Sequence, residues 1–423
     1  MIDGLVARAR RTFRALKHRN YRLFFIGQGV SLVGTWAQQV AMSWLTWRLT
    51  ESPLMLGVVA FCGNVGMLAL GSFAGVLVDR IDRRRALVAT QSLLLVQAAV
   101  LAAITAAGWV RVGHLIGLAL FLSMVQAIDV VLRQATYVHM VEDREDLPNA
   151  IALNSMLVNS GRVVGPALAG LLLAVTGEAV CFAINALSFA GVIFALSRMR
   201  WPDERRDAAG GWWGSFTEGA RYAFGFGPSR ALLALVALLA FTITPYSSLM
   251  PVYAQVQFAG GPQTLGFLLA AAGTGALAST TWLAGRADVR GLGRVIGGAA
   301  VASGAALAAF SHLRWIAPAL VLMVVVGGGV ILAAASSNTI LQTIVDDRLR
   351  GRVAGFYTLA FMGVAPLGHV TAGALAGAIG TQNAFLLNGL VAATGGLVFL
   401  RALPRLAVEM RPIYRRLGIL PDE

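Results

Sequence analysis

The chain has 423 residues, of which 57% are hydrophobic and only 13% are charged, and its formal net charge is +14 at pH 7. Soluble globular proteins carry about 25% charged residues, so this composition excludes a soluble enzyme or binding domain and indicates a chain that crosses the membrane many times. The positive charge would favour a nucleic-acid partner if it formed one face. It recurs instead in short blocks between apolar stretches, so we expect no nucleic-acid partner.

The N-terminal 20 residues form a basic amphipathic segment that we expect to lie on the cytoplasmic surface of the membrane. This segment lacks the apolar core of a cleavable signal peptide. The first apolar stretch follows at about 21–47. Two more, at about 54–78 and 86–107, are each long enough to cross a hydrocarbon layer of about 30 Å as a helix.

The short segment between the second and third stretches, Asp79–Arg85, contains four arginines and two aspartates. These charges are too costly to leave in hydrocarbon, so the turn is expected in the cytoplasm. Nine further stretches follow, at about 115–138, 150–175, 179–196, 231–258, 265–285, 295–310, 316–344, 353–379 and 384–403. Arginines recur in alternate connections, which predicts twelve spans in a bacterial-type cytoplasmic membrane, with both termini in the cytoplasm.

Residues 199–230 form the one long polar connector. We therefore expect an all-α membrane protein with two six-helix bundles, residues 1–198 and residues 231–423, joined by a cytoplasmic loop. The second bundle ends in a basic cytoplasmic tail. The two halves read as repeats, since one constant offset relates Leu56-Gly57, Gly66 and Asp79 to Leu265-Gly266, Gly275 and Asp288.

The charged turn and the residues before it form a motif. The pattern Gly75-x-Leu-x-Asp79-Arg80-x-x-Arg83-Arg84 resembles the signature loop of the major facilitator superfamily of secondary transporters, although Asp82 stands where that family usually has glycine. The resemblance implies a substrate cavity between the two halves, near the membrane midplane. It also implies a gate on the cytoplasmic side that holds the halves together when the cavity opens outward. The gating residues would be Gly75, Asp79, Arg80, Arg83 and Arg84.

A second motif lies in the fifth apolar stretch, where Gly161, Gly165-Pro166 and Gly170 follow the lead-in Leu147–Asn154. It resembles the drug:proton antiporter branch of the superfamily and, together with Arg162, the exporter branch that includes the enterobactin exporter. The alternative is an ordinary pair of helices that pack through glycines. The second half carries Ala365-Pro366-Leu-Gly368 in a comparable place, as a weaker copy.

The sequence contains no enzyme motif: a P-loop, a dinucleotide-binding glycine fingerprint and Gly-x-Ser-x-Gly are all absent. We therefore expect neither an enzyme nor an ATP-driven pump. No cofactor is expected, and a proton gradient is the expected driving force. Cys62 and Cys181 lack the spacing of metal ligands and are expected to be small core residues, so no metal site is predicted.

Charged and titratable side chains inside the spans are the candidates for proton coupling, because burying them is costly. Asp129 and Arg133 lie one helical turn apart in the fourth span, and Arg162 lies near the middle of the fifth. We predict that Asp129 pairs with Arg162 or Arg133 and that protonation of Asp129 breaks the pair. A permanent structural salt bridge is the alternative. His369 could carry a proton, or could be hydrogen-bonded between helices.

Polar and aromatic residues of the first, seventh and tenth spans are predicted to line the cavity, because these helices line it in the superfamily that the chain resembles. The residues are Gln28, Trp36, Gln38, Gln39, Pro245, Tyr246 and Asn338. Two asparagines, Asn64 and Asn185, are instead expected to make hydrogen bonds between helices.

These observations predict a secondary transporter that exports a small amphipathic organic molecule, such as a drug or a siderophore, by proton antiport with alternating access. Two alternatives stay open. One is a major facilitator importer of a sugar or organic acid, and the other is a non-transporting membrane sensor or assembly partner on the same fold. The expected partners are the substrate and the lipid bilayer, and a monomer is the default expectation.

Overall fold

The computed structural model of the chain describes residues 13–78, 81–137, 140–141, 143–199, 221–286 and 288–419. Asp79 and Arg80 of the predicted gating loop therefore lie outside the described residues. The same holds for most of the basic N-terminal segment and for positions 200–220 of the central connector.

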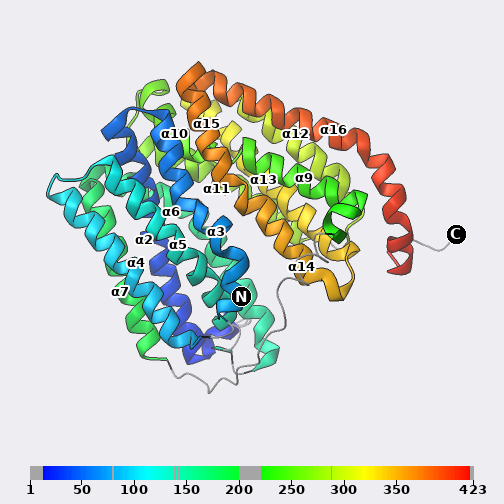
Figure 1. Ribbon diagram of the computed structural model, residues 1–423, viewed down its shortest axis with the longest axis horizontal. Helices are drawn as coiled ribbons and strands as arrows, with labels where there is room; N and C mark the ends of the chain where they lie inside the picture. Colours follow the sequence, from blue (N-terminus) through cyan, green and yellow to red (C-terminus); the bar gives the residue numbers. More distant parts are fainter. Residues whose placement is uncertain are drawn as a thin grey trace, which may run out of the picture.

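The described residues of the N-terminal half form six long helices, which Figure 1 draws in blue to green. They are α2 (Arg19–Thr50), α3 (Pro53–Val78), α4 (Arg83–Ala106), α5 (Val112–Tyr137), α6 (Leu147–Thr176) and α7 (Glu178–Ser197). A short 3-10 turn, η1 (Arg14–Lys17), precedes them. Helices suit this apolar sequence because, in hydrocarbon, the backbone polar groups must pair within the helix itself.

In the C-terminal half, the described residues form four uninterrupted helices and two broken crossings. The uninterrupted helices are α11 (Pro262–Ala284), α12 (Leu292–Phe310), α13 (Ile316–Ile344) and α16 (Thr381–Arg416). The first broken crossing consists of α9 (Gly227–Thr242), α10 (Tyr246–Val252) and the π-helical η4 (Tyr253–Gln257). The second consists of α14 (Asp347–Thr358), the π-helical η5 (Leu359–Gly363) and α15 (Ala365–Ile379). Pro245 and Pro366 stand at the breaks, where proline removes a backbone donor.

The predicted all-α fold with twelve crossings is confirmed. Eleven of the described helical stretches are long and apolar enough to cross a membrane. The twelfth crossing is α2, in which three glutamines lower the mean hydropathy; its 32 residues span about 48 Å. The last helix continues beyond the predicted apolar stretch at 384–403 and reaches Arg416, and its Leu406 and Met410 are buried. Figure 1 shows α16 along the edge of that half.

The two halves meet at two glycine crossings. At the first, α3 crosses α15, and a Cβ added at Gly373 would lie 2.7 Å from the carbonyl oxygen of Pro53 and 3.0 Å from the Cα of Gly57. At the second, α6 crosses α11, and a Cβ at Gly170 would lie 2.6 Å from the carbonyl oxygen of Pro262 and 2.8 Å from the Cα of Gly266. Only glycine permits this backbone approach, so both crossings depend on it.

The glycine crossings set the register between the two repeats. Gly170 and Gly373 occupy matching places, and so do Pro166 and His369, whose carbonyl oxygens face Gly266 and Gly57 respectively. The placement of Ala365-Pro366 as the copy of Gly165-Pro166 is therefore wrong by three residues. Gly368 is the counterpart of Gly165, and a histidine stands where the first half has its proline.

Asp82, which departs from the family pattern, has a structural role. It is the N-cap of α4, and its side chain accepts a hydrogen bond from the backbone N–H of Arg85 at 2.9 Å. Its φ of −66° lies in a region that any residue adopts, so the turn does not require glycine at this position. An aspartate in this place satisfies a free N–H at the start of the helix, which stabilises the helix.

A cluster of charges ties the N-terminal segment to the connection between α5 and α6. The buried carboxylate of Asp146 pairs with Arg14, with Lys17 at 2.6 Å and with His18 at 2.9 Å. Next to it, the side chain of Asn149 accepts a hydrogen bond from the backbone N–H of Ala15 at 2.9 Å. The hydrogen bonds from Lys17 and His18, and the charge of Arg14, hold the pKa of Asp146 below its ordinary value.

We predict that Asp146→Asn lowers the thermal midpoint of the purified protein by several degrees at neutral pH. Because the folded-state pKa of Asp146 is depressed, its contribution is fully present above the unfolded pKa of about 4 and is lost as the pH falls through the folded pKa. The difference in midpoint between wild type and variant should therefore shrink below about pH 4. Asp143→Asn is the matched control, since Asp143 is half exposed and lies 3.9 Å from Lys17. An equal loss in both variants would contradict the assignment.

Candidate functional site

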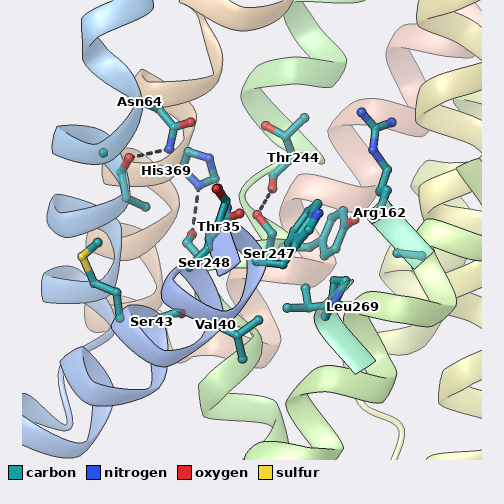
Figure 2. Close-up of a pocket in the computed structure, with 18 of the residues that line it drawn as sticks. Thr35, Val40, Ser43, Asn64, Arg162, Thr244, Ser247, Ser248, Leu269 and His369 are labelled. Atoms are coloured by element: carbon teal, nitrogen blue, oxygen red, sulfur yellow. Dashed lines mark hydrogen bonds between the residues drawn. The ribbon is translucent and has the colours of Figure 1, made fainter. Parts of the chain in front are cut away.

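A cavity of about 430 Å³ lies between the two halves. Its walls come from α2, α3, α5, α6 and α7 of the first half and from α10, α11, α13, η5 and α15 of the second. Most of the lining is apolar or aromatic, with a limited number of amide, hydroxyl and basic groups, which is the usual character of a small-molecule site. Figure 2 shows these side chains converging from several helices.

Four of the seven predicted cavity residues line this cavity, namely Trp36, Gln38, Gln39 and Tyr246. Gln28 lies two turns before Trp36 and accepts a hydrogen bond from Arg133 instead. Pro245 is the N-cap of α10, and its neighbour Thr244 contributes to the wall. Asn338 lies about two turns beyond Ile331, the last lining residue of α13. What these residues do in transport stays a prediction.

Hydroxyl-bearing residues around the start of α10 and an asparagine on α3 also line the cavity, although none of them was predicted to do so from the sequence. Thr244, Ser247 and Ser248 all line the cavity, as does Asn64. The prediction that Asn64 bonds another helix is wrong, because its side chain donates to the carbonyl of Ala60 in the same helix at 2.9 Å. From the sequence of α10 and the residues before it, only Pro245 and Tyr246 were predicted to line the cavity.

A chain of amides fixes the wall formed by α2. Asn185 of α7 donates to Gln38 of α2 at 2.8 Å, and Gln38 donates to Gln97 of α4 at 3.0 Å. The predicted hydrogen bond between helices at Asn185 is thus confirmed. All three side chains are buried, so the network holds α2, α4 and α7 in one arrangement.

Asp129 pairs with Arg133 on its own helix, and not with Arg162. Its carboxylate is fully buried, and Oδ2 lies 2.8 Å from Nε of Arg133. Its other oxygen, Oδ1, accepts hydrogen bonds from Thr90 at 2.7 Å and from Gln91 at 2.8 Å. Oδ2 accepts no hydrogen bond from the part of the chain that the structure describes. The two oxygens of this carboxylate therefore differ: Oδ1 accepts two hydrogen bonds, and Oδ2 has the ion pair with Arg133.

Arg133 has a second partner on another helix. Its guanidinium donates from Nη1 to Oε1 of Gln28 on α2 at 2.6 Å. Side-chain exposure is 27% for Arg133 and 0% for Asp129, so Arg133 connects a buried carboxylate to a more accessible region. Neither residue lines the cavity.

The glycine motif of α6 packs on two sides. A Cβ at Gly165 would lie 2.4 Å from Cδ1 of Trp36, and one at Gly161 would lie 2.0 Å from a methyl group of Leu32, so both glycines face α2. Gly170 faces α11, as described above. Pro166 and Arg162, which lie between these glycines, line the cavity. The motif therefore packs α6 against α2 of its own half and against α11 of the other half. The middle of the motif lies at the cavity wall.

His369 lies on the cavity wall and bridges two helices. Its Nδ1 is 3.0 Å from the hydroxyl oxygen of Ser248, which joins α15 to α10 across the C-terminal half. The side chain is buried but still contributes to the cavity. The hypothesis that His369 is hydrogen-bonded between helices is therefore confirmed, whereas its role in proton transfer stays a prediction.

The described part of the predicted gating loop lies at the basic end of the molecule. Gly75 is in the last turn of α3, and Arg83 and Arg84 open α4. This end is opposite the glycine crossings, which lie near the first turns of α3 and α11 and the last turns of α6 and α15. The two cysteines occupy ordinary positions, since Cys181 is buried and Cys62 is half-buried.

Comparison with known proteins gives consistent results. A family described as "Transmembrane secretion effector" matches residues 10–413. The multidrug efflux pump Tap of Mycolicibacterium fortuitum is 28% identical over 400 residues, which cover 91% of this chain and 95% of that protein. The staphyloferrin A transporter of Staphylococcus aureus is 28% identical over 174 residues, 39% of this chain and 44% of that transporter.

Solved transporter structures share the fold. The nucleoside transporter NupG superposes with a TM-score of 0.71 at 15% identity, covering 92% of this chain and 99% of that one. A bacterial homolog of the human lysosomal transporter Spinster, in an inward-facing and unoccupied conformation, gives a TM-score of 0.67 at 13% identity, covering 94% and 98%. At these identities the likeness concerns the fold alone.

Proposed function

Since the chain belongs to the transmembrane secretion effector family of the major facilitator superfamily, we propose that it exports small amphipathic organic molecules, of the drug or siderophore kind, in exchange for protons. The observation that carries this proposal is the cavity of about 430 Å³ that both halves enclose, with walls that are mostly apolar or aromatic and that also carry amide, hydroxyl and basic groups. The Tap efflux pump, related along nearly the whole chain, supports export over import. The protein would act as a monomer in the cytoplasmic membrane, without a metal or an organic cofactor.

Alternating access would come from movement of the two halves about the cavity. The glycine crossings close the end opposite the arginine-rich connections. If those connections and both termini lie in the cytoplasm, as the charge distribution favours, the crossings close the cavity on the outer side. The crossings would then separate in each cycle to release substrate outward.

Proton coupling is assigned to the pair formed by Asp129 and Arg133. A proton would bind at Oδ2, the oxygen of Asp129 that the Arg133 ion pair occupies without a hydrogen bond. Neutralising Asp129 weakens its hold on the guanidinium, which keeps its hydrogen bond to Gln28 on α2. Protonation would thus shift the guanidinium of Arg133 away from Asp129 and toward Gln28 on α2. This would be a two-state change inside the first half. His369 is the second candidate for carrying the proton.

The test is efflux from cells that express the protein, measured with three fluorescent amphiphiles of one scaffold: dansylamide, dansylglycine and dansylcadaverine. We expect export of at least one of them, and we expect a protonophore to abolish it. Correctly inserted protein that exports none of the three would contradict the proposal. Net uptake would favour the importer alternative.

A further inference from the structure

Among the described residues that line the cavity, the one arginine is Arg162. Arg162 lies at the middle of α6 and is half-buried at the wall. No aspartate or glutamate is among the described residues that line the cavity. Asp129, the buried carboxylate of α5, is already paired with Arg133. Among the described residues, therefore, no carboxylate forms an ion pair with Arg162.

An arginine at this depth in a membrane requires water or a counter-ion, because its charge is costly in hydrocarbon. The guanidinium stays protonated in proteins, so the charge cannot be removed by titration. The other lining groups do not cancel it. Gln39, Ser247 and Tyr246 are neutral, and His369 can only add positive charge. The cavity is therefore positive, and its counter-ion has to come from what enters it.

The shape of the cavity indicates the rest of such a ligand. Figure 2 shows Arg162 and His369 on opposite sides, with Ser248 next to His369 and with Thr244 and Ser247 between the two. Leu269, Ile331 and Phe361 supply apolar wall from three other elements. A planar guanidinium binds a carboxylate or a related oxyanion through two parallel hydrogen bonds. An apolar body with one anionic group would match both parts of this site.

We propose that Arg162 binds a carboxylate or related oxyanion of the exported molecule, so that the cavity selects anionic amphiphiles. This inference rests on the proposed export function and narrows its substrate class. It has an energetic consequence: an anion moving out and a proton moving in both carry positive charge inward. Export is then electrogenic, and the inside-negative membrane potential drives it.

The first experiment measures the potential of the cavity without any substrate. In a Cys62→Ala, Cys181→Ala background, two separate variants each introduce one thiol into the cavity wall. Ser247→Cys places it on the C-terminal half, and Asn64→Cys places it on the N-terminal half. Each thiol is treated with anionic sulfonatoethyl methanethiosulfonate and with cationic trimethylammonioethyl methanethiosulfonate. The measured quantity is the rate of labelling by the anionic reagent divided by the rate of labelling by the cationic reagent. We expect this ratio to be higher in the cavity than for a free thiol in water, and to fall about tenfold in Arg162→Gln.

Two further variants separate charge from structure. Arg162→Lys should keep the ratio, and Arg162→Glu should invert it, since the sign of the charge changes. Arg314→Gln, an exposed arginine in the connection after α12, is the control and should keep the wild-type ratio. The proposal is overturned if Arg162→Gln leaves the ratio unchanged at both thiols. It is equally overturned if neither thiol reacts, since polar ions would then not reach the site.

The second experiment compares transport of dansylglycine and dansylamide in proteoliposomes with an imposed potential. We expect the ratio of dansylglycine to dansylamide transport to be high, to fall about tenfold in Arg162→Gln and to recover in Arg162→Lys. Export of dansylamide without export of dansylglycine would reject the anion site and leave the export function standing. Labelling that depends on Arg162, in a protein that transports neither compound, would reject export and leave the anion site standing.

Discussion

Gly373→Leu is expected to reduce export by between about fivefold and about a hundredfold, since overpacking typically costs about 1–3 kcal/mol and 1.4 kcal/mol is a factor of ten. The first side-chain atom would already stand 2.7 Å from the carbonyl oxygen of Pro53 and 3.0 Å from the Cα of Gly57. Those atoms belong to the backbone of α3, which cannot rotate away as a side chain can. The substitution therefore opposes the conformation in which α3 and α15 cross, and transport that requires this conformation slows.

Gly377→Leu is the matched control for this prediction. Gly377 lies one turn beyond Gly373 on the same helix, and a Cβ added there meets nothing within 4 Å. We expect this variant to export at close to the wild-type rate. Initial rates of efflux, normalised to the amount of inserted protein, make the comparison. Equal activity of the two variants would show that the crossing does not form during transport.

Asp129→Asn is expected to abolish the dependence of export on the proton gradient while substrate exchange continues. The amide imitates the protonated carboxyl group, because it keeps the size of the side chain and removes its charge. The hydrogen bonds that Thr90 and Gln91 donate to Oδ1 can persist, whereas the ion pair with Arg133 cannot. Efflux at several external pH values, together with counterflow of labelled substrate, measures the effect. Full pH dependence in the variant would reject Asp129 as the proton site.

The same variant also tests the structural alternative. Removing one partner of a buried ion pair costs about 3–5 kcal/mol, here toward the lower end because Arg133 is partly exposed. If the pair is only structural, Asp129→Asn, Arg133→Gln should restore both stability and proton-dependent export. If the pair carries the coupling, the double variant should regain stability alone. Glu178→Gln removes the acid of the Arg48 pair, which spans 2.8 Å near the opposite end, and should leave coupling intact.

The candidate site was only partly predictable from the sequence. Trp36, Gln38 and Gln39 stood out because polar and large aromatic side chains are rare in an apolar helix, and all three line the cavity. Ser247 and Ser248 did not stand out. A serine in an apolar helix can bond a backbone carbonyl three or four residues earlier, as Ser247 does with Thr244. Its sequence context is therefore the same whether it faces lipid or a cavity.

The charged residues illustrate the same limit. The sequence placed Asp129, Arg133 and Arg162 inside spans and left two partners open for the aspartate. The structure pairs Asp129 with Arg133 and leaves Arg162 at the cavity wall. Likewise, the sequence found glycines and a proline in both halves, but the crossings corrected the register that relates them.

The sequence by itself determined the membrane location, the helical class, the number of crossings and the superfamily. Each of these follows from hydropathy, charge and short motifs, which are read over neighbouring residues. The tertiary structure alone decided which arginine pairs with Asp129, which polar groups face the cavity and which glycines meet across the halves. The reason is geometric: one residue turns a helix by about 100°, so a small change in rotation or register exchanges the residues that face a neighbour. That rotation is set by packing between helices far apart in the chain.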